Sequence, residues 1–191
     1  MRNILIIGVA RTGKTTLSNM IKEKYNQYNL IHSDSIVWGM IRGSEKEEFY
    51  VKNIKARKEW EHGEEFQKML VEIFRASIKK DKTGFGNILE TGQLEPKYIS
   101  DLIKKENIYC ICLGHSNLDK KGIIKLCREH DTDEDWSSKL TDEQLGINAD
   151  KWVEKNELLK NECPKYGIRY IDTSKNRNKI LQQIVTEIDE M

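Results

Sequence analysis

The stretch GVARTGKT, which runs from Gly8 to Thr15, decides how the rest of the sequence is interpreted, because it fits the pattern G-x-x-x-x-G-K-[ST]. In such a loop the glycines let the backbone curl until its N–H groups point inward at phosphate oxygens, and Lys14 reaches the β- and γ-phosphates. The hydroxyl of Thr15 is the expected ligand of Mg²⁺. A helical pattern over 15–24 follows the loop, so a helix N-terminus adds a favourable field for anions. The stretch therefore predicts a site for a nucleoside triphosphate together with Mg²⁺.

Most of this loop and the first turn of the following helix are expected to contact the nucleotide. The predicted contacts are Gly8, Ala10, Arg11, Thr12, Gly13, Lys14, Thr15 and Thr16. The side chain of Arg11 can face the phosphates or turn away from them, and the pattern leaves both directions open. A glycine-rich turn with a solvated lysine is the alternative for the whole stretch, and the strand-loop-helix context argues against it.

Short apolar runs of strand length alternate with helical patterns along the chain, which predicts βα units around a parallel sheet. The predicted strands are 3–8, 30–33, 87–90, 108–113 and 168–171. Each run is apolar on both faces, as expected of a strand that is covered on both sides. Helical spacing of apolar residues is clearest in 66–78. The sequence thus favours an α/β fold around five parallel strands.

Two segments, 35–80 and 115–150, are longer than a minimal sheet of this kind needs. In open α/β sheets ligands bind outside the carboxyl ends of the strands. Both segments start there, so both are candidates for covering the site and closing over its ligands. Peripheral helices without a functional role are the alternative.

Length and composition narrow the class of protein. The 191 residues suit one domain, and 32 basic against 31 acidic residues give a net charge of +1. This balance weighs against a protein that binds nucleic acid or a membrane surface mainly by charge. No stretch approaches the roughly 18 consecutive apolar residues of a membrane span, and the apolar run before Gly8 is too short for a signal peptide. Four cysteines are too few for a disulfide scaffold of this length, so we expect reduced thiols and a cytoplasmic protein.

With the loop of residues 8–15 after its first predicted strand, the sequence resembles the P-loop small-molecule kinases, the broad adenylate-kinase-like and shikimate-kinase-like group. The resemblance extends over nearly the whole chain in layout, and the loop is its one sharp motif. It implies a three-layer P-loop NTPase with a five-stranded parallel sheet, helices on both faces and a lid-like insertion. It also implies a single domain over 1–191, in which 35–80 surrounds the phosphoryl acceptor and 115–150 is the lid. The implied activity is transfer of the γ-phosphoryl group of ATP to a small molecule or a nucleotide.

The carboxylates after the second and third predicted strands are the next candidates. In this group the second strand ends in an acidic or polar run at the acceptor, and IHSD (residues 31–34) ends in that way. The resemblance implies that Asp34 is a general base on the acceptor hydroxyl or a group that orients Mg²⁺. Capping of the next helix is its structural alternative. Glu90 stands where P-loop proteins usually carry an acidic group near Mg²⁺, although Asp is commoner there, and Thr91 before Gly92 departs from the usual pattern.

Phosphoryl transfer needs positive charge near the γ-phosphate, and kinases of this group take it from arginines of the lid. Arg128 is the single arginine of 115–150. The resemblance therefore makes Arg128 the candidate that closes over the phosphates, although an exposed structural arginine would give the same pattern. Thr173, after the fifth predicted strand, is expected beside the adenine through its backbone, or as part of a helix N-cap.

The acceptor side is less sharply defined. Arg42, Arg57 and Arg75 lie within 35–80, where one or two could grip an acceptor phosphate bidentately. We select Arg42 and Arg75, together with Trp38, which lies four residues after Asp34. The sequence does not identify the acceptor, and it does not define the oligomeric state.

A GTPase-like switch or an ATP-hydrolysing regulatory module is the alternative function. ETGQ (residues 90–93) is similar to D-x-x-G-Q, and TSK (residues 173–175) is similar to the loop that closes on guanine. The first match is one residue short and begins with Glu. HSNLD (residues 115–119) lacks the N-K-x-D run that binds guanine. An acidic residue directly after the second strand also suits an acceptor site better than a switch loop, so a kinase is the preferred hypothesis.

Overall fold

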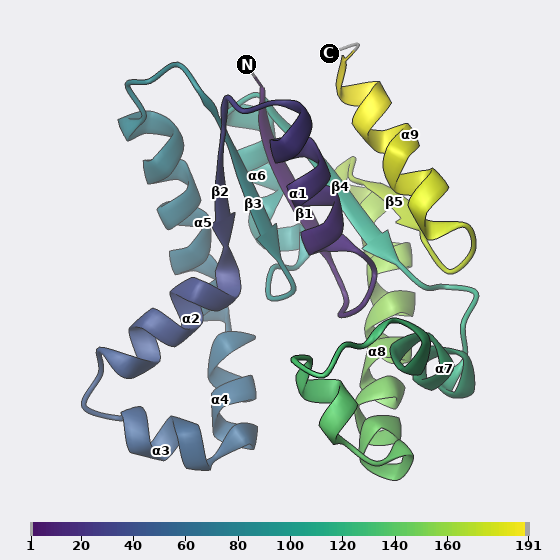
Figure 1. Cartoon of the computed structure of the whole chain (residues 1–191). Helices are drawn as coiled ribbons and strands as arrows, with labels where there is room; N and C mark the ends of the chain where they lie inside the picture. The colour runs from purple at the N-terminus through teal and green to yellow at the C-terminus, as the bar shows by residue number, and fades with distance from the viewer. Residues whose placement is uncertain (1, 190–191) are drawn as a thin grey trace.

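Five parallel strands form one sheet in the computed structural model, which describes residues 2–189 (Figure 1). They are β1 (Asn3–Gly8), β2 (Tyr28–His32), β3 (Gly86–Thr91), β4 (Ile108–Gly114) and β5 (Arg169–Asp172), in the spatial order β2-β3-β1-β4-β5. All neighbouring strands pair in parallel. The predicted α/β class and its five parallel strands are confirmed. The second strand starts two residues earlier than predicted and ends at His32, because Ser33 is already the first residue of a helix.

The helices differ in length and in how their ends are stabilised. In chain order they are α1 (Lys14–Lys24), α2 (Ser33–Arg42), α3 (Glu47–Lys52), α4 (Ile54–Glu61), α5 (Glu64–Lys80), α6 (Pro96–Lys105), α7 (Lys120–His130), α8 (Asp142–Glu162) and α9 (Arg177–Asp189), with short 3-10 helices at Trp136–Lys139 and Cys163–Tyr166. Thr141 and Gln144 form a capping box at the start of α8. Among residues 2–189, no helix combines the length and the apolar character that a membrane crossing needs.

Alternate residues of the central strand β1 explain why helices cover both faces of the sheet. Ile4 and Ile6 belong to a hydrophobic cluster that includes the buried faces of α1 and α9. Leu5 and Ile7 belong to a second cluster, which includes the buried faces of α2, α5 and α6. These four side chains are buried, and burial of one such side chain contributes about 1.5–3 kcal/mol. The apolar run before the loop is therefore the centre of two hydrophobic cores.

The two long segments are helical, and each begins at the carboxyl end of a strand of the sheet. Segment 35–80 contains most of α2 and all of α3, α4 and α5, and segment 115–150, which we call the lid segment, contains α7 and the start of α8. In the lid segment α7 packs on α8 around a separate cluster with Ile123 and Leu145 at its centre. Figure 1 shows α2 and α4 on one side of the carboxyl ends of the central strands, and α7 and α8 on the other.

Gly8 connects β1 to the loop in a conformation that other residues rarely adopt. Its φ is 143°, and a Cβ atom at this position would lie 2.0 Å from the carbonyl oxygen of Leu113 in β4. We expect Gly8→Ala to lower the free energy of unfolding by about 3 kcal/mol or more, because the backbone of the central sheet must shift. Thermal denaturation measures this loss. Gly39→Ala is the control, since a Cβ at Gly39 meets nothing within 4 Å. Equal melting temperatures for the two variants would contradict the expectation.

Candidate active site

The loop between β1 and α1 has the backbone shape that its glycines predict. Gly13 has a φ of 90° and is the N-cap residue of α1, with no side-chain hydrogen bond to the first turn. The first N–H groups of α1 are therefore left without a capping side chain, as an anion-binding helix N-terminus requires. Thr12 is buried, and its hydroxyl donates to the carbonyl oxygen of Val9 at 2.9 Å, which fixes the loop from inside.

Lys14 lies inside the loop rather than in solvent. Its Nζ donates to the carbonyl oxygen of Val9 at 2.7 Å. Burial lowers the pKa of Lys14, while the charges of Glu90 and Asp34 act in the opposite direction. None of the ion pairs within residues 2–189 includes this ammonium group, and a buried charge without a paired charge is costly. A bound triphosphate would supply the missing negative charge.

Glu90 lies near the end of β3, in register with Ile6 of β1 and His32 of β2. Its Oε1 is 2.9 Å from Nδ1 of His32, so the carboxylate is held in place from the neighbouring strand. The carboxylate is almost completely buried, and its charge acts on Lys14. The strand order thus brings this group beside the loop, as the sequence pattern predicts for strand-end carboxylates.

Asp34 is oriented by a buried glutamine. Gln93 Nε2 donates to Oδ1 of Asp34 at 3.0 Å. Gln93 Oε1 accepts hydrogen bonds from the hydroxyls of Ser33 and Thr91, at 2.6 and 2.9 Å. Since two hydroxyls fix which end of the amide is the acceptor, the amide N–H faces Asp34. Asp34 lies in the first turn of α2 and makes no capping hydrogen bond. The structure therefore does not show Asp34 as the cap of this helix.

The donors of the site fit a magnesium ion that is shared with phosphates. Mg²⁺ prefers hard oxygen ligands and is usually held by one or two carboxylates together with phosphates and water. Thr15 is exposed in the first turn of α1, and Glu90 provides a carboxylate beside the loop. Within residues 2–189 no group of three or more His, Cys, Asp or Glu side chains could hold a metal alone. Bound nucleotide phosphates would therefore complete the set of ligands.

Thr173 connects the end of β5 to the nucleotide-binding loop. Its hydroxyl donates to the carbonyl oxygen of Thr12 at 3.0 Å, and the carbonyl oxygen of Gly114 lies 3.2 Å away. The structure thus places Thr173 beside the nucleotide-binding loop, and its contact with the adenine stays a prediction. Its side chain is buried and already bonded, and its backbone N–H donates to the carbonyl oxygen of Gly114 at 2.8 Å. Thr16, in the first turn of α1, is exposed next to the loop.

Arg11 faces the lid segment. Its guanidinium group pairs with the carboxylates of Asp131 and Asp135, at 2.8 and 2.9 Å, and contacts the hydroxyl of Ser137. The sequence left the direction of this side chain open, and the structure turns it toward the acidic part of the lid segment. Arg11 therefore links the nucleotide-binding loop to the lid segment.

Arg128 is engaged within the lid segment. It donates to the carboxylate of Asp142 at 2.8 Å and to the carbonyl oxygens of Ser137 and Leu140, at 3.1 and 2.5 Å. These bonds hold the end of α7 against the start of α8. In this arrangement the guanidinium group is not directed at the loop, so its role over the phosphates stays a prediction that requires these bonds to break.

Arg75 is not brought to the acceptor side. It pairs with Glu72 at 2.5 Å and lies 3.8 Å from Glu106. Glu106 directly follows α6 and precedes β4, so it lies at the amino edge of the sheet, whereas the loop lies at the carboxyl edge. The predicted contact of Arg75 with the acceptor is therefore not part of the proposal below.

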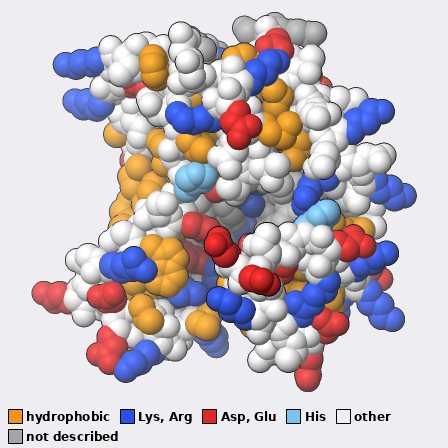
Figure 2. Space-filling view, viewed as in Figure 1, with side chains coloured by type: hydrophobic (Ala, Val, Ile, Leu, Met, Phe, Trp, Pro, Cys, Tyr) orange, Lys and Arg blue, Asp and Glu red, His pale blue; other side chains and the backbone are white. Residues whose placement is uncertain are grey.

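A cavity of about 450 Å³ borders the exposed face of α2 and is lined by Asp34, Ser35, Trp38, Gly39 and Arg42. The predicted acceptor residues Trp38 and Arg42 thus lie together with Asp34. Figure 2 shows the molecule hollowed between the helices that follow β2 and the lid segment, with acidic side chains along the rim.

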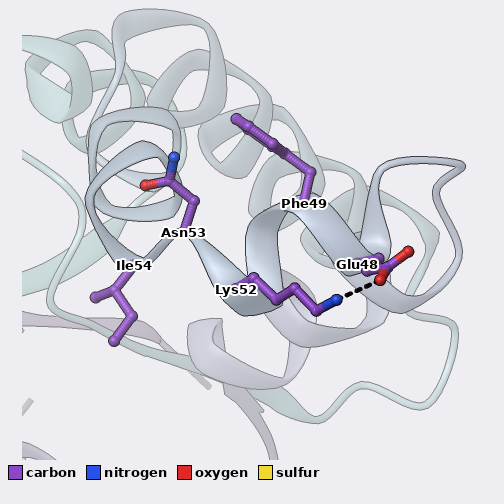
Figure 3. A pocket seen from close by; sticks show the side chains of 5 residues that line it. All are labelled: Glu48, Phe49, Lys52, Asn53 and Ile54. Carbon is purple, nitrogen blue, oxygen red and sulfur yellow. Dashed lines mark hydrogen bonds and ion pairs between the residues drawn. The ribbon is translucent and has the colours of Figure 1, made fainter.

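A second pocket lies on the outside of α3 and α4 (Figure 3). It is lined by Glu48, Phe49, Lys52, Asn53 and Ile54, and Lys52 pairs with Glu48 of the same helix. None of the loop residues or strand-end carboxylates lines it. It is therefore not part of the candidate site.

The structure adds Lys155, a residue of α8 that the sequence analysis did not single out. Its Nζ donates to the carbonyl oxygen of Gly92, directly after β3, at 2.7 Å. Burial lowers the pKa of Lys155 to about 8, and the charge of Lys14 contributes to this shift. The helical pattern of α8 gives a weak signal for it, because Lys155 flanks Asn156 and Leu159 on the buried face.

His62, just after α4, shares this environment. Burial and the charges of Lys155 and Lys58 lower its pKa to about 3, so the ring is neutral at physiological pH. The charge of Lys155 acts on His62, so the end of α4 and the middle of α8 lie near each other.

Lys155→Met is expected to stabilise the folded chain at pH 7. The pKa of about 8 lies below the ordinary value of 10.5, so keeping Lys155 charged in the fold costs on the order of 2–3 kcal/mol below pH 8. Between pH 8 and 10.5 the unfolded chain binds more protons than the folded chain, so the stability contributed by this group rises with pH in that window. The variant should melt higher at pH 7 and should lack this rise.

Thermal denaturation at pH 7 and at pH 9.5 measures both effects of Lys155→Met. Lys151→Met, an exposed lysine of the same helix, is the matched control and should change neither. A Lys155 variant that melts lower than the wild type and keeps its pH dependence would contradict the expectation.

Comparison with solved structures agrees with this architecture. A shikimate kinase from Bacteroides thetaiotaomicron has a TM-score of 0.61 at 14% identity, over 100% of this chain and 99% of that one. A gluconokinase from Sinorhizobium meliloti 1021 has a TM-score of 0.56 at 12% identity, and the match covers 99% of this chain and 92% of that one. A deoxyadenosine kinase from M. mycoides, with bound dATP, has a TM-score of 0.52 at 16% identity, and the match covers 98% of this chain and 99% of that one. No protein-family model and no curated protein matches the sequence. The chain therefore has a P-loop kinase-like fold.

Proposed function

We propose, from this P-loop kinase-like fold and the geometry of the site, that the chain is an ATP-dependent kinase for a small-molecule or nucleotide acceptor. The observation that carries the proposal is the meeting of Lys14, Glu90 and Asp34. They come from three separate elements, they lie within electrostatic reach of one another, and Asp34 borders the cavity of α2. A site that only hydrolysed a nucleotide would not need a carboxylate that opens on a separate cavity.

In this proposal the loop binds the triphosphate, and groups at the strand ends bind the metal and stabilise the transferred group. The backbone N–H groups of the loop and Lys14 hold the triphosphate, and Thr15 and Glu90 would hold Mg²⁺. The ion, when bound, neutralises charge on the β- and γ-phosphates. Lys155 adds a second cation near the strand end, where negative charge spreads over the transferred group.

Asp34 acts on the acceptor. An acceptor hydroxyl oxygen forms a bond to the γ-phosphorus, the bond from that phosphorus to the bridging oxygen of ADP breaks, and the hydroxyl proton passes to the Asp34 carboxylate. Gln93 donates to Oδ1 of Asp34, so in this proposal the other carboxylate oxygen accepts the proton. A general base needs only hydrogen-bond reach of the proton that it accepts.

We also propose a cytoplasmic setting for the reaction. The four cysteines are free and buried, which suits a compartment where thiols stay reduced. The proposed partner is the acceptor itself, with no role for nucleic acid or a membrane.

Release of ADP from ATP and Mg²⁺ tests the proposed function. The acceptors should include nucleosides, nucleoside monophosphates, sugars, shikimate-like acids and aminocyclitols, each run beside a control without acceptor. A strong rise with one class establishes a kinase. A rate of ADP release that is equal with every acceptor and with none would instead favour the ATP-hydrolysing module. The role of Asp34 as a base on the acceptor would then be wrong as well.

A further inference from the structure

Within residues 2–189, Arg177 is the one arginine whose guanidinium group has no hydrogen bond, ion pair or ring contact. It is the first residue of α9, and its Nε is buried. Every other arginine of the described chain has a carboxylate or an aromatic ring as a partner. A buried donor without a partner is costly, and in a native protein it calls for an explanation such as a ligand.

The side chain of Arg177 lies against the nucleotide-binding loop. A Cβ atom on Gly13, the N-cap residue of α1, would lie 3.3 Å from Cδ of Arg177. The charge of Arg11 acts on Arg177, and the charge of Arg177 acts on His115, which directly follows β4. The guanidinium group therefore belongs to the cations around the loop. Arg11 is compensated by carboxylates of the lid segment, and the described residues offer no such compensation to Arg177.

The acidic residues closest to Arg177 in the chain bind other donors. Asp172, the last residue of β5, accepts hydrogen bonds from the hydroxyl of Ser116 and the backbone N–H of Ser174, at 2.5 and 2.8 Å. The acidic residues of α9 lie near its end, where they pair with other cations. The charge of Arg177 is therefore left for an anion that the chain itself does not supply.

The strand order places Arg177 on one particular side of the loop. In the order β2-β3-β1-β4-β5, Asp34 and Glu90 belong to the side of β2 and β3, whereas Arg177 follows β5 on the opposite side of β1 (Figure 1). In the proposed reaction the γ-phosphoryl group is transferred toward Asp34. The rest of the nucleotide then extends from the loop toward β4 and β5. Since the α-phosphate is the one attached to the nucleoside, it is the phosphate on the side of Arg177.

We propose that Arg177 binds the α-phosphate of the nucleotide held in the loop. A guanidinium group matches phosphate oxygens with two parallel hydrogen bonds, and the phosphate supplies the negative charge that this arginine lacks. The inference rests on the proposed function, because it needs a nucleotide in the loop, and it adds a phosphate contact from outside residues 8–15. The α-phosphate does not react during transfer, so the contact contributes to affinity for the nucleotide rather than to the rate.

Titration calorimetry with ATP and with ADP, each with Mg²⁺, tests this contact in the wild type and in Arg177→Gln. Both nucleotides carry the α-phosphate, so we expect Kd to rise about tenfold to a hundredfold for each of them and by a similar factor. Arg177→Lys keeps the charge and should recover part of the affinity. A loss confined to ATP would assign the guanidinium group to the γ-phosphate and overturn the inference, and so would unchanged affinity for both nucleotides.

Two further measurements separate a binding residue from a structural one. Without nucleotide, Arg177→Gln should melt within about 2 °C of the wild type, because no protein group loses a partner. In steady-state kinetics the loss should appear in KM for ATP rather than in kcat. A large loss of stability in Arg177→Gln would show that the guanidinium group serves the fold, and it would overturn the inference.

Lys179→Gln is the matched control, since it removes a positive charge from an exposed side chain two residues further along α9. It should leave both Kd values within about twofold of the wild type, because an exposed charge is screened by salt. An effect as large as that of Arg177→Gln would mean that the general charge of α9, and not a contact with Arg177, determines the affinity.

The inference and the proposed function fail in different ways. If Arg177→Gln binds ATP and ADP more weakly while no acceptor is phosphorylated, the kinase function is wrong and the phosphate contact stands. If an acceptor is phosphorylated and Arg177→Gln binds both nucleotides as tightly as the wild type, only the contact is wrong. A wild type that binds neither ATP nor ADP overturns both.

Discussion

Lys14→Ala is expected to raise the Kd for ATP about tenfold to a hundredfold and to lower the rate of phosphoryl transfer about a thousandfold. The ammonium group lies inside the loop and donates to the carbonyl oxygen of Val9, and in the proposed function it turns to a phosphate when the nucleotide binds. Loss of this charge removes one of the few cations at the strand ends. Charge-assisted hydrogen bonds of this kind are about twice as strong as neutral ones.

The effect of Lys14→Ala on stability separates a functional lysine from a structural one. Burial lowers the pKa of Lys14, so in the absence of nucleotide its charge is a cost to the fold. The variant should therefore melt no lower than the wild type while it loses affinity for ATP. Isothermal titration with ATP and Mg²⁺ gives the affinity, and thermal denaturation gives the stability.

Lys24→Ala is the matched control, because Lys24 lies in the last turn of the same helix and pairs with Asp189. It should leave the affinity for ATP unchanged. If Lys14→Ala binds ATP as tightly as the wild type, the loop is not the triphosphate-binding site, and the proposed kinase function is wrong as well.

The fold could be predicted because its signals are local. Ile4 and Ile6 alternate with Leu5 and Ile7, so the run is apolar on both faces, and this pattern predicts a strand that is covered on both sides. The glycines at both ends of the loop are dictated by backbone conformation at those positions. Neither property depends on how distant segments pack.

The loop and the strand ends of the site could be predicted for a similar reason. The carboxyl ends of parallel strands meet at one edge of the sheet, so Glu90 and Asp34 had to lie near Lys14 once the strands were assigned. The roles proposed for these carboxylates rest on the identity of residues 8–15. Sequence order and sheet geometry were sufficient.

The remaining groups depend on how helices turn back on the sheet. Arg57 and Arg75 lie in the same segment, yet α5 reverses direction after Gly63 and carries Arg75 to the opposite edge. Lys155 reaches Gly92 only because α8 packs against the end of β4, where its residue Asn156 accepts the backbone N–H of His115. Such contacts arise from tertiary packing, and no spacing in the sequence encodes them.

Asp34→Asn is the variant that tests the chemistry of the proposed site most directly. The asparagine side chain has nearly the same shape and can still accept the hydrogen bond from Gln93 Nε2, so the arrangement of α2 should be kept. It cannot accept a proton from the acceptor hydroxyl. We expect kcat to fall about 10²- to 10⁴-fold, which is the usual contribution of a general base.

The affinity for ATP and the KM of the acceptor should change little in Asp34→Asn, because the nucleotide is held by the loop and the far end of the acceptor by other groups. Steady-state kinetics with the best acceptor, together with titration of ATP, separate these quantities. Asp101→Asn, an exposed aspartate of α6 that pairs with Lys105, controls for the loss of one carboxylate. A kcat within about fivefold of the wild type would remove Asp34 as the base, since a fall that small is well below the contribution of a positioned proton acceptor. It would leave Asp34 as a group that only positions the acceptor beside the loop.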